Sequence, residues 1–146
     1  MCLAEKDERT PYQPWRQILL YPCLDMTACM ASHRQFAEGY LLTQPLYRWY
    51  RSNYAGQIEK PLQWRLSPLF AYDLSGLPPT VLLYVGFDPL RDEAAAYAVK
   101  LTLADVRLET LYFADMIHGF LTLGGAIPAA GAAVNRIAQA LGALQA

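Results

Sequence analysis

The pattern of hydrophobic positions along the chain predicts three β-strands. Residues 17–21 form a short apolar run between prolines, and residues 80–85 form a second run that ends at Gly86. Both runs are typical of buried strands, because they lack the polar alternation of a strand that faces water. Residues 107–113 alternate between apolar and polar side chains. This third segment is therefore predicted to lie at a sheet edge, exposed on one face.

Two segments after the second strand have the composition and spacing of helices. Residues 90–104 are rich in alanine, with Asp92 and Glu93 placed in the first turn, where the helix dipole favours anions. A helix between two strands predicts a β-α-β unit whose strands run parallel and whose connection is right-handed. Residues 127–144 form the second predicted helix, with Pro128 in its first turn.

The middle of the chain is rich in aromatic residues and less regular. Residues 33–54 are predicted to be helical with an interruption at Pro45, and residues 57–76 are predicted to be irregular. An aromatic helix inserted between strands is a candidate lid over a pocket. Ordinary packing against the core is an equally good interpretation of the same residues.

Composition indicates one soluble globular domain and excludes some partners. The chain has 146 residues, of which 54% are hydrophobic, so it can bury a sizeable core. The 12 basic and 13 acidic residues leave no excess of positive charge to bind nucleic acid or an anionic membrane. No stretch is apolar enough to span a membrane, and residues 1–9 are too charged for a signal peptide.

The three cysteines, Cys2, Cys23 and Cys29, predict neither a disulfide framework nor a zinc site. A reducing, cytoplasmic setting fits them best, since disulfides persist mainly in oxidising compartments. No cofactor or metal ion is expected.

Asp88 and His118 are the candidate catalytic residues. Each follows directly after a predicted parallel strand, so both should lie at the carboxyl-end edge of the sheet, where α/β proteins bind ligands. A carboxylate that holds an imidazole leaves the second ring nitrogen free to act as a base. As an alternative, Asp88 before a proline could be an ordinary helix cap, and His118 beside a glycine could be an ordinary loop residue.

From Tyr21 onward the sequence resembles the carboxyl-terminal half of the hormone-sensitive-lipase-like esterases and lipases, which have the α/β-hydrolase fold. The resemblance rests on segments that occur in the expected order, namely Leu19–Pro22, Phe36–Thr43, Ser67–Leu69, Leu74–Pro79, Gly86–Glu93 and Met116–Phe120. It implies that Asp88 and His118 are the acid and base of a Ser-His-Asp triad. It also implies one partial domain over residues 1–146, with about three mainly parallel strands, flanking helices and a cap-like helical insertion at residues 30–66.

Other polar residues in the resembling segments are given structural roles. Asp25 lies in the loop that enters the cap, and His33 at the cap entrance is predicted to be a polar surface residue. Asp92 and Glu93 are interpreted as favourable charges in the first turn of a helix.

Two motifs of the family are absent from this sequence. It has neither the Gly-x-Ser-x-Gly nucleophile elbow nor the His-Gly-Gly-type oxyanion loop, and its serines, Ser32, Ser52, Ser67 and Ser75, lack the flanking glycines. Neither Cys2 nor Ser67 is a convincing substitute. We therefore expect the chain to begin downstream of the nucleophile of such an enzyme.

Three hypotheses follow for function. The first is hydrolysis of short-chain carboxylic esters, with a small acyl ester as substrate and a serine supplied from elsewhere. The second is a catalytically inactive remnant that associates with itself. The third is one fragment of a longer or split hydrolase. Under all three, a sheet with only these strands exposes the edge of its first strand, so we expect a homo-oligomer formed through that edge.

Overall fold

The computed structural model describes residues 14–56 and 61–143. Cys2 and Leu144, which the sequence analysis included in its predictions, lie outside these ranges. Among the described helices, none is both long and apolar enough to cross a membrane.

The described strands form one parallel sheet. They are β1 (Gln17–Leu20), β2 (Thr80–Phe87) and β3 (Leu108–Ile117), in the order β1-β2-β3, and both pairings are parallel. The three predicted strands and their parallel arrangement are confirmed. The predicted edge position of the third strand is also confirmed. This strand ends at Ile117, four residues beyond its predicted end at Phe113.

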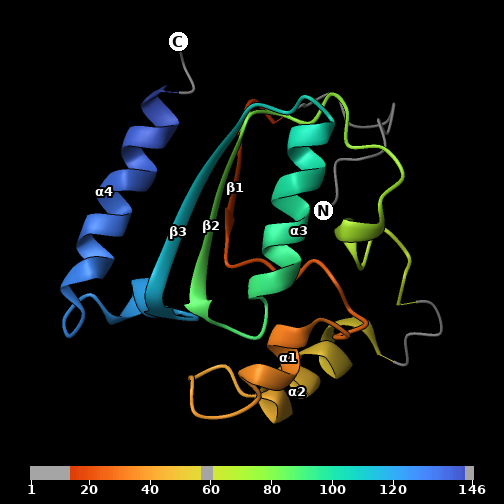
Figure 1. Cartoon of the computed structure of the whole chain (residues 1–146), viewed down its shortest axis with the longest axis vertical. Helices are drawn as coiled ribbons and strands as arrows, with labels where there is room; N and C mark the ends of the chain where they lie inside the picture. The colour runs from red at the N-terminus through yellow and green to blue at the C-terminus, as the bar shows by residue number, and fades with distance from the viewer. Residues whose placement is uncertain (1–13, 57–60, 144–146) are drawn as a thin grey trace.

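Helices cover both faces of this sheet (Figure 1). Helix α3 (Arg91–Leu103) connects β2 to β3 and packs on one face, while α4 (Pro128–Ala143) packs against β2 and β3 on the other. Each helix has its own apolar cluster. The α4 side includes Val81, Leu83 and Phe120, and the α3 side includes Leu24, Tyr97 and Leu101. Strand β2 is buried by both layers, which explains its continuous apolar run.

Strand β1 is covered on one face only. Leu19 packs into the cluster under α3. Ile18 and Leu20 pair with Val81 and Leu83 and point toward the α4 side, yet they are 45% and 39% exposed. The reason is that α4 contacts β2 and β3 and leaves the β1 part of that face uncovered.

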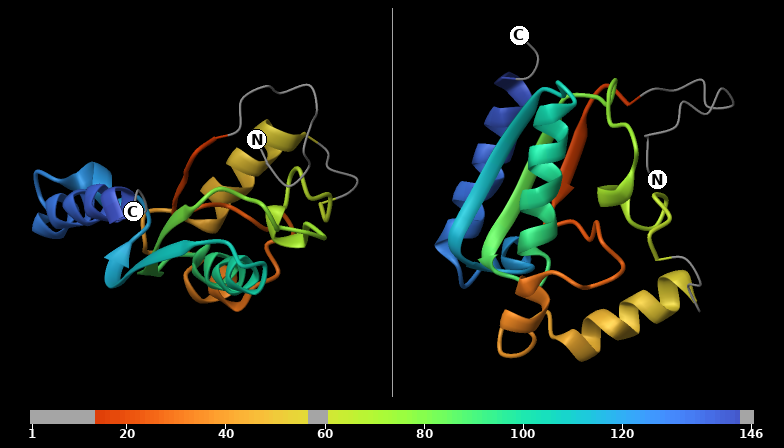
Figure 2. Two further views of the ribbon diagram at one scale, coloured as in Figure 1. Left: turned by 90° about the horizontal axis from the view of Figure 1, so that it is seen from above. Right: turned by 45° about the vertical axis from the view of Figure 1, so that its right-hand side comes forward.

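The middle region lies across the carboxyl ends of the strands, as two views of the ribbon show (Figure 2). It contains α1 (Ala31–Gln35) and α2 (Gln44–Ala55). The predicted break at Pro45 is wrong, because this proline lies in the first turn of α2, where its missing N–H costs nothing. The break falls at residues 36–43 instead, where Gly39 and Leu41 have positive φ angles.

Two short 3₁₀ helices complete the described structure, η1 (Pro68–Phe70) before β2 and η2 (Phe120–Leu123) after β3.

The end of the β2–β3 pairing is irregular. Val85 pairs with Phe113, whereas Phe87 pairs with Ile117, so β3 uses four residue steps where β2 uses two. Gly86 lies inside this bulge, and a Cβ atom placed on it would be 1.9 Å from the backbone oxygen of Ala114. Only glycine permits the two strands to approach so closely here.

Candidate active site

Asp88 and His118 lie together at the carboxyl end of the sheet. Asp88 follows the last residue of β2 and His118 the last residue of β3, and His118 Nδ1 is 2.8 Å from Asp88 Oδ2. The Asp88 side chain is 1% exposed, and its other oxygen accepts a hydrogen bond of 2.9 Å from the backbone N–H of Leu90. Both carboxylate oxygens therefore have a donor, and the imidazole is held from one side.

This arrangement leaves one ring nitrogen of His118 free of the carboxylate. An ionised Asp88 can only accept, so Nδ1 carries the shared proton and Nε2 keeps its lone pair. The His118 side chain is 23% exposed, and the ring of Tyr21 packs against it with 4.6 Å between the ring centroids. Burial, followed by the charge of Asp88, raises the pKa of the Tyr21 phenol. Tyr21 therefore stays neutral and provides an aromatic wall.

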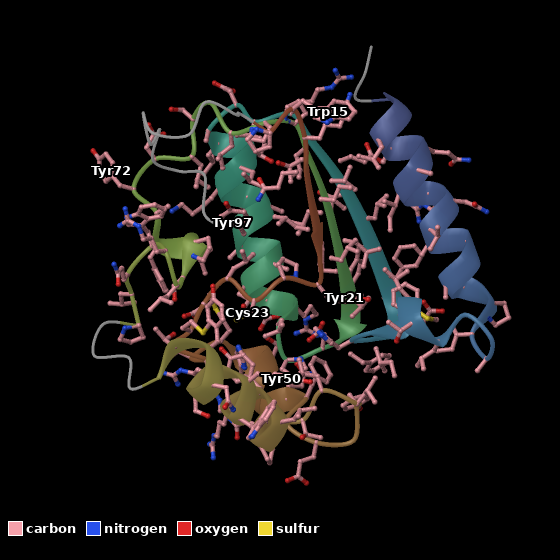
Figure 3. All side chains as sticks on the ribbon, turned by 180° about the vertical axis from the view of Figure 1, so that it is seen from behind. Trp15, Tyr21, Cys23, Tyr50, Tyr72 and Tyr97 are labelled. Carbon is pink, nitrogen blue, oxygen red and sulfur yellow. The ribbon has the colours of Figure 1, made fainter. Side chains whose placement is uncertain are left out.

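His118 opens into a cavity of about 450 Å³ between the sheet edge and α2. Figure 3 shows Tyr21 at the end of the sheet and Tyr50 on α2, with Cys23 near the end of α3 that is closer to α2. The lining is mostly aromatic and apolar and comprises Tyr21, Cys23, Met26, Leu42, Tyr47, Tyr50, Arg51, Tyr54, Leu90 and His118. A cavity of this size accommodates a small organic ligand.

Cys23 is a poor nucleophile despite its position in this cavity. Burial, followed by the negative charge of Glu93, raises the pKa of its thiol to about 12. Its sulfur lies 3.7 Å from the Tyr47 hydroxyl. Because the thiolate is the reactive form, a thiol this weakly acidic is essentially unreactive near neutral pH.

A second imidazole–carboxylate pair lies nearby, and the sequence analysis missed it. His33 on α1 and Glu93 on α3 are both fully buried, with 2.9 Å between His33 Nε2 and Glu93 Oε2. The prediction that His33 is a surface residue is therefore wrong. Glu93 does lie in the first turn of α3, but it also accepts hydrogen bonds from the backbone N–H groups of Leu24 and Asp25.

The pair joins α1 to the start of α3. The neighbouring residues strengthen this connection, because Ser32 N–H donates to Asp92 Oδ2 at 2.9 Å and the Ser32 hydroxyl donates to the Pro89 carbonyl at 2.6 Å. Burial raises the pKa of Glu93, and the hydrogen bond from His33 opposes that rise. His33 Nδ1 is buried with no hydrogen-bond partner. This imidazole is enclosed, unlike that of His118.

Asp25 has the structural role given to it by the sequence analysis. It is 1% exposed, and its Oδ1 accepts hydrogen bonds from the N–H and the hydroxyl of Thr27. These bonds fix the turn that leads from β1 toward α1.

All four serine hydroxyls have acceptors other than His118. Ser32 donates to Pro89, Ser52 to Trp49, Ser67 to Pro61 and Ser75 to Asp73. Ser67 is also buried and accepts from the Met26 N–H at 2.8 Å. Within the described residues, no group of three or more His, Cys, Asp or Glu side chains could hold a metal ion. None of the four serine hydroxyls therefore donates to His118.

Comparison with known proteins gives consistent matches. A sequence model for the alpha/beta hydrolase fold matches residues 1–122. The chain is 39% identical over 133 residues to the carboxylic ester hydrolase LipN of Mycobacterium tuberculosis, covering 90% of this chain and 35% of that protein. It is 30% identical over 128 residues to an ethyl acetate hydrolase of Pseudomonas putida, covering 88% of this chain and 40% of that protein.

A solved structure agrees with these matches. The structure of an ester hydrolase from the metagenome of Lake Arreo, complexed with a bipyridine phosphonate derivative, superposes with a TM-score of 0.85 at 38% identity. The match covers 89% of this chain and 41% of that one. The chain therefore spans well under half the length of these similar proteins.

Proposed function

Because the chain belongs to the alpha/beta hydrolase fold family, we propose that it forms part of a carboxylic ester hydrolase acting on short-chain acyl esters. In this proposal Asp88 is the acid and His118 the base of a Ser-His-Asp triad. The observation that carries the proposal is the 2.8 Å contact between His118 Nδ1 and Asp88, with the imidazole opening into the cavity.

The geometry is suited to one defined proton transfer. Asp88 keeps Nδ1 protonated and fixes the ring, so that Nε2 can take the proton of an attacking hydroxyl and later return it to the leaving alcohol. As it does so, the nearby carboxylate stabilises the imidazolium. The serine and the oxyanion-hole donors are proposed to come from outside the described residues, since each serine hydroxyl here already has another acceptor.

Hydrolysis of p-nitrophenyl acetate and butyrate by the purified protein, combined with the portion of the hydrolase that supplies the serine, tests this proposal. Replacing His118 with Ala, or Asp88 with Asn, should reduce turnover at least about 100-fold, since general base catalysis is typically worth that much. Asp73→Asn is the matched control, because Asp73 is an exposed acid whose bonds are to Ser75. Equal rates for wild type and His118→Ala would contradict the proposal.

A second candidate is a binding or self-associating domain without catalysis of its own. It is favoured by the hydrogen bonds that occupy all four serine hydroxyls. A fluorophosphonate probe, which labels activated serines, should then label no residue of the purified chain. The third alternative, one fragment of a longer or split hydrolase, predicts that adding the missing portion restores labelling and makes turnover depend on His118.

Self-association through β1 is the proposed assembly. Among the described strands β1 has a neighbour on one side only, and Ile18 and Leu20 add exposed apolar surface beside its other edge. Light scattering at micromolar concentration should detect a dimer or larger species, and Leu20→Lys should dissociate it. Val134→Lys, on an exposed position of α4, is the control. A monodisperse wild-type monomer would contradict this assembly.

Two further features belong to the same proposal. Residues 30–66, of which 57–60 lie outside the described ranges, are proposed to be a cap-like insertion, which fits the contribution of α2 to the lining of the cavity. The protein acts in the cytoplasm, which fits the free thiols of Cys23 and Cys29. Cell fractionation tests the location, and a secreted or periplasmic product would overturn it.

A further inference from the structure

Among the described residues that line the cavity, one carries a permanent positive charge and none is acidic. Arg51 is the one described lining residue that is always charged at neutral pH, and none of the others is an aspartate or glutamate. Helix α2 as a whole carries Arg48 and Arg51 and no acid. Within residues 14–56 and 61–143, Arg51 has no ion pair. A cation at this position is therefore available to a ligand.

Arg51 lies on the side of α2 that lines the cavity, and it also lines a smaller hollow with Arg48, Ser52 and Gly56. Tyr47, Arg51 and Tyr54 are spaced three and four residues apart along α2, so they share one side of the helix, and all three line the cavity. The guanidinium also lowers the pKa of the Tyr47 phenol, against the larger effect of burial, which raises it. The charge of Arg51 therefore reaches the phenol of a residue that lines the cavity.

We propose that Arg51 binds a carboxylate on the ligand, so that this cavity prefers esters that also carry a free acid group. The inference rests on the proposed function, because His118 at one part of the cavity would act on the ester while Arg51 on α2 holds the acid. An arginine can bind a carboxylate with two parallel hydrogen bonds, which gives orientation as well as affinity. The tyrosine rings would contact the apolar part between the two groups.

Binding must be separated from hydrolysis to test this inference. Two methyl ketones serve as probes, since neither has an ester bond to cleave. They are 5-oxohexanoate, which carries a carboxylate, and 2-hexanone, which does not. Titrations followed by ¹H–¹⁵N NMR give an affinity for each ketone and show which backbone amides respond.

The wild-type protein should bind 5-oxohexanoate about five- to tenfold more tightly than 2-hexanone at low salt, in line with one charge-assisted contact that is partly exposed to solvent. High salt should reduce this preference. Arg51→Gln should abolish it, and Arg51→Lys should keep part of it, because lysine retains the charge without the planar donor pair.

Arg48→Gln is the matched control. Arg48 has the same charge on the same helix, but it donates to Gln44 at 3.1 Å and is absent from the lining of this cavity. This variant should keep most of the preference for the acid. The inference is overturned if wild type binds both ketones equally or neither at all, if Arg51→Gln keeps the preference, or if Arg48→Gln loses it to the same extent.

The outcome can be separated from that of the proposed function. If turnover of p-nitrophenyl esters does not depend on His118 while Arg51→Gln still removes the preference for 5-oxohexanoate, the hydrolase proposal fails and the carboxylate site stands. If turnover depends on His118 while Arg51→Gln keeps the preference for 5-oxohexanoate, the hydrolase proposal stands and the carboxylate site is overturned.

Discussion

The described residues contain two imidazole–carboxylate pairs whose contacts have similar lengths but whose surroundings differ. His118 and Asp88 are 2.8 Å apart, and His33 and Glu93 are 2.9 Å apart. The His118 side chain is 23% exposed and lines the cavity, whereas that of His33 is 1% exposed and its second nitrogen meets no partner. The comparison teaches that a short contact to a carboxylate does not identify a base. What distinguishes the pairs is access to the other nitrogen.

Chemical modification should reveal the largest difference between the pairs. The chain has only two histidines, so diethyl pyrocarbonate compares them within one sample. His118 should react at least about 100-fold faster than His33, because exposing a buried side chain requires a local opening that costs several kcal/mol. Peptide mapping by mass spectrometry at early times measures both rates. In urea the two rates should become equal, and similar rates in the folded protein would contradict the comparison.

The next largest effect concerns stability. Glu93→Ala should lower the free energy of unfolding by about 3–5 kcal/mol, because it leaves buried polar groups of Leu24, Asp25 and His33 without their acceptor. His118→Ala should cost only about 1 kcal/mol, since its ring is partly exposed. Urea denaturation measures both. Equal losses would mean that the two pairs contribute to the fold in the same way.

A glycine substitution should affect the exposed pair and leave the buried pair in place. Gly86→Ala would push β2 from β3 directly before Asp88, at an expected cost of about 1–3 kcal/mol. Hydrogen exchange should increase at Phe87 and Asp88, while His33 stays protected from modification. Gly131→Ala is the control, because it adds a methyl group to open space on α4 and should stabilise the protein by up to about 1 kcal/mol. Destabilisation of the same size by both changes would contradict the close approach seen here.

The smallest expected effect is a pH dependence from Glu93. Burial raises its pKa in the folded state above the ordinary 4.5, although the hydrogen bond from His33 opposes this. The folded protein therefore holds this proton more firmly than the unfolded chain does. The unfolding free energy of wild type relative to Glu93→Gln should be highest below pH 4.5 and decline as pH rises above 4.5, through the folded pKa. A difference that grows with pH would show that ionised Glu93 is the stabilising form.

Sequence reasoning predicted the exposed pair because that pair depends on strand ends alone. Asp88 and His118 each follow a strand whose apolar pattern was clear, and the carboxyl ends of parallel strands meet at one edge. The buried pair depends on α1 packing against the start of α3, a contact between segments 60 residues apart. No local pattern determines such a contact.

One signal for the buried pair was nevertheless present. Glu93 lies four residues before Tyr97 and eight before Leu101, so it belongs to the buried stripe of α3 and not to its solvent face. An acid in such a stripe requires a partner, and this would have directed attention to His33. The charge of Arg51 in the cavity had no comparable signal, because it depends on how the segment at residues 36–43 places α2.

The irregular pairing between β2 and β3 determines which residue of β3 lies beside Asp88. Four residue steps of β3 lie beside two of β2, so β3 contains two residues more than a regular ladder would need. An even number preserves which side chains face α3 and which face α4, while it changes which residue stands opposite Asp88. Regular pairing of the same sequence beyond Val85 and Phe113 would place Met116 opposite Asp88, so the two extra residues are what brings His118 to the carboxylate. The irregular pairing therefore positions the imidazole without changing which face of the sheet each side chain of β3 covers.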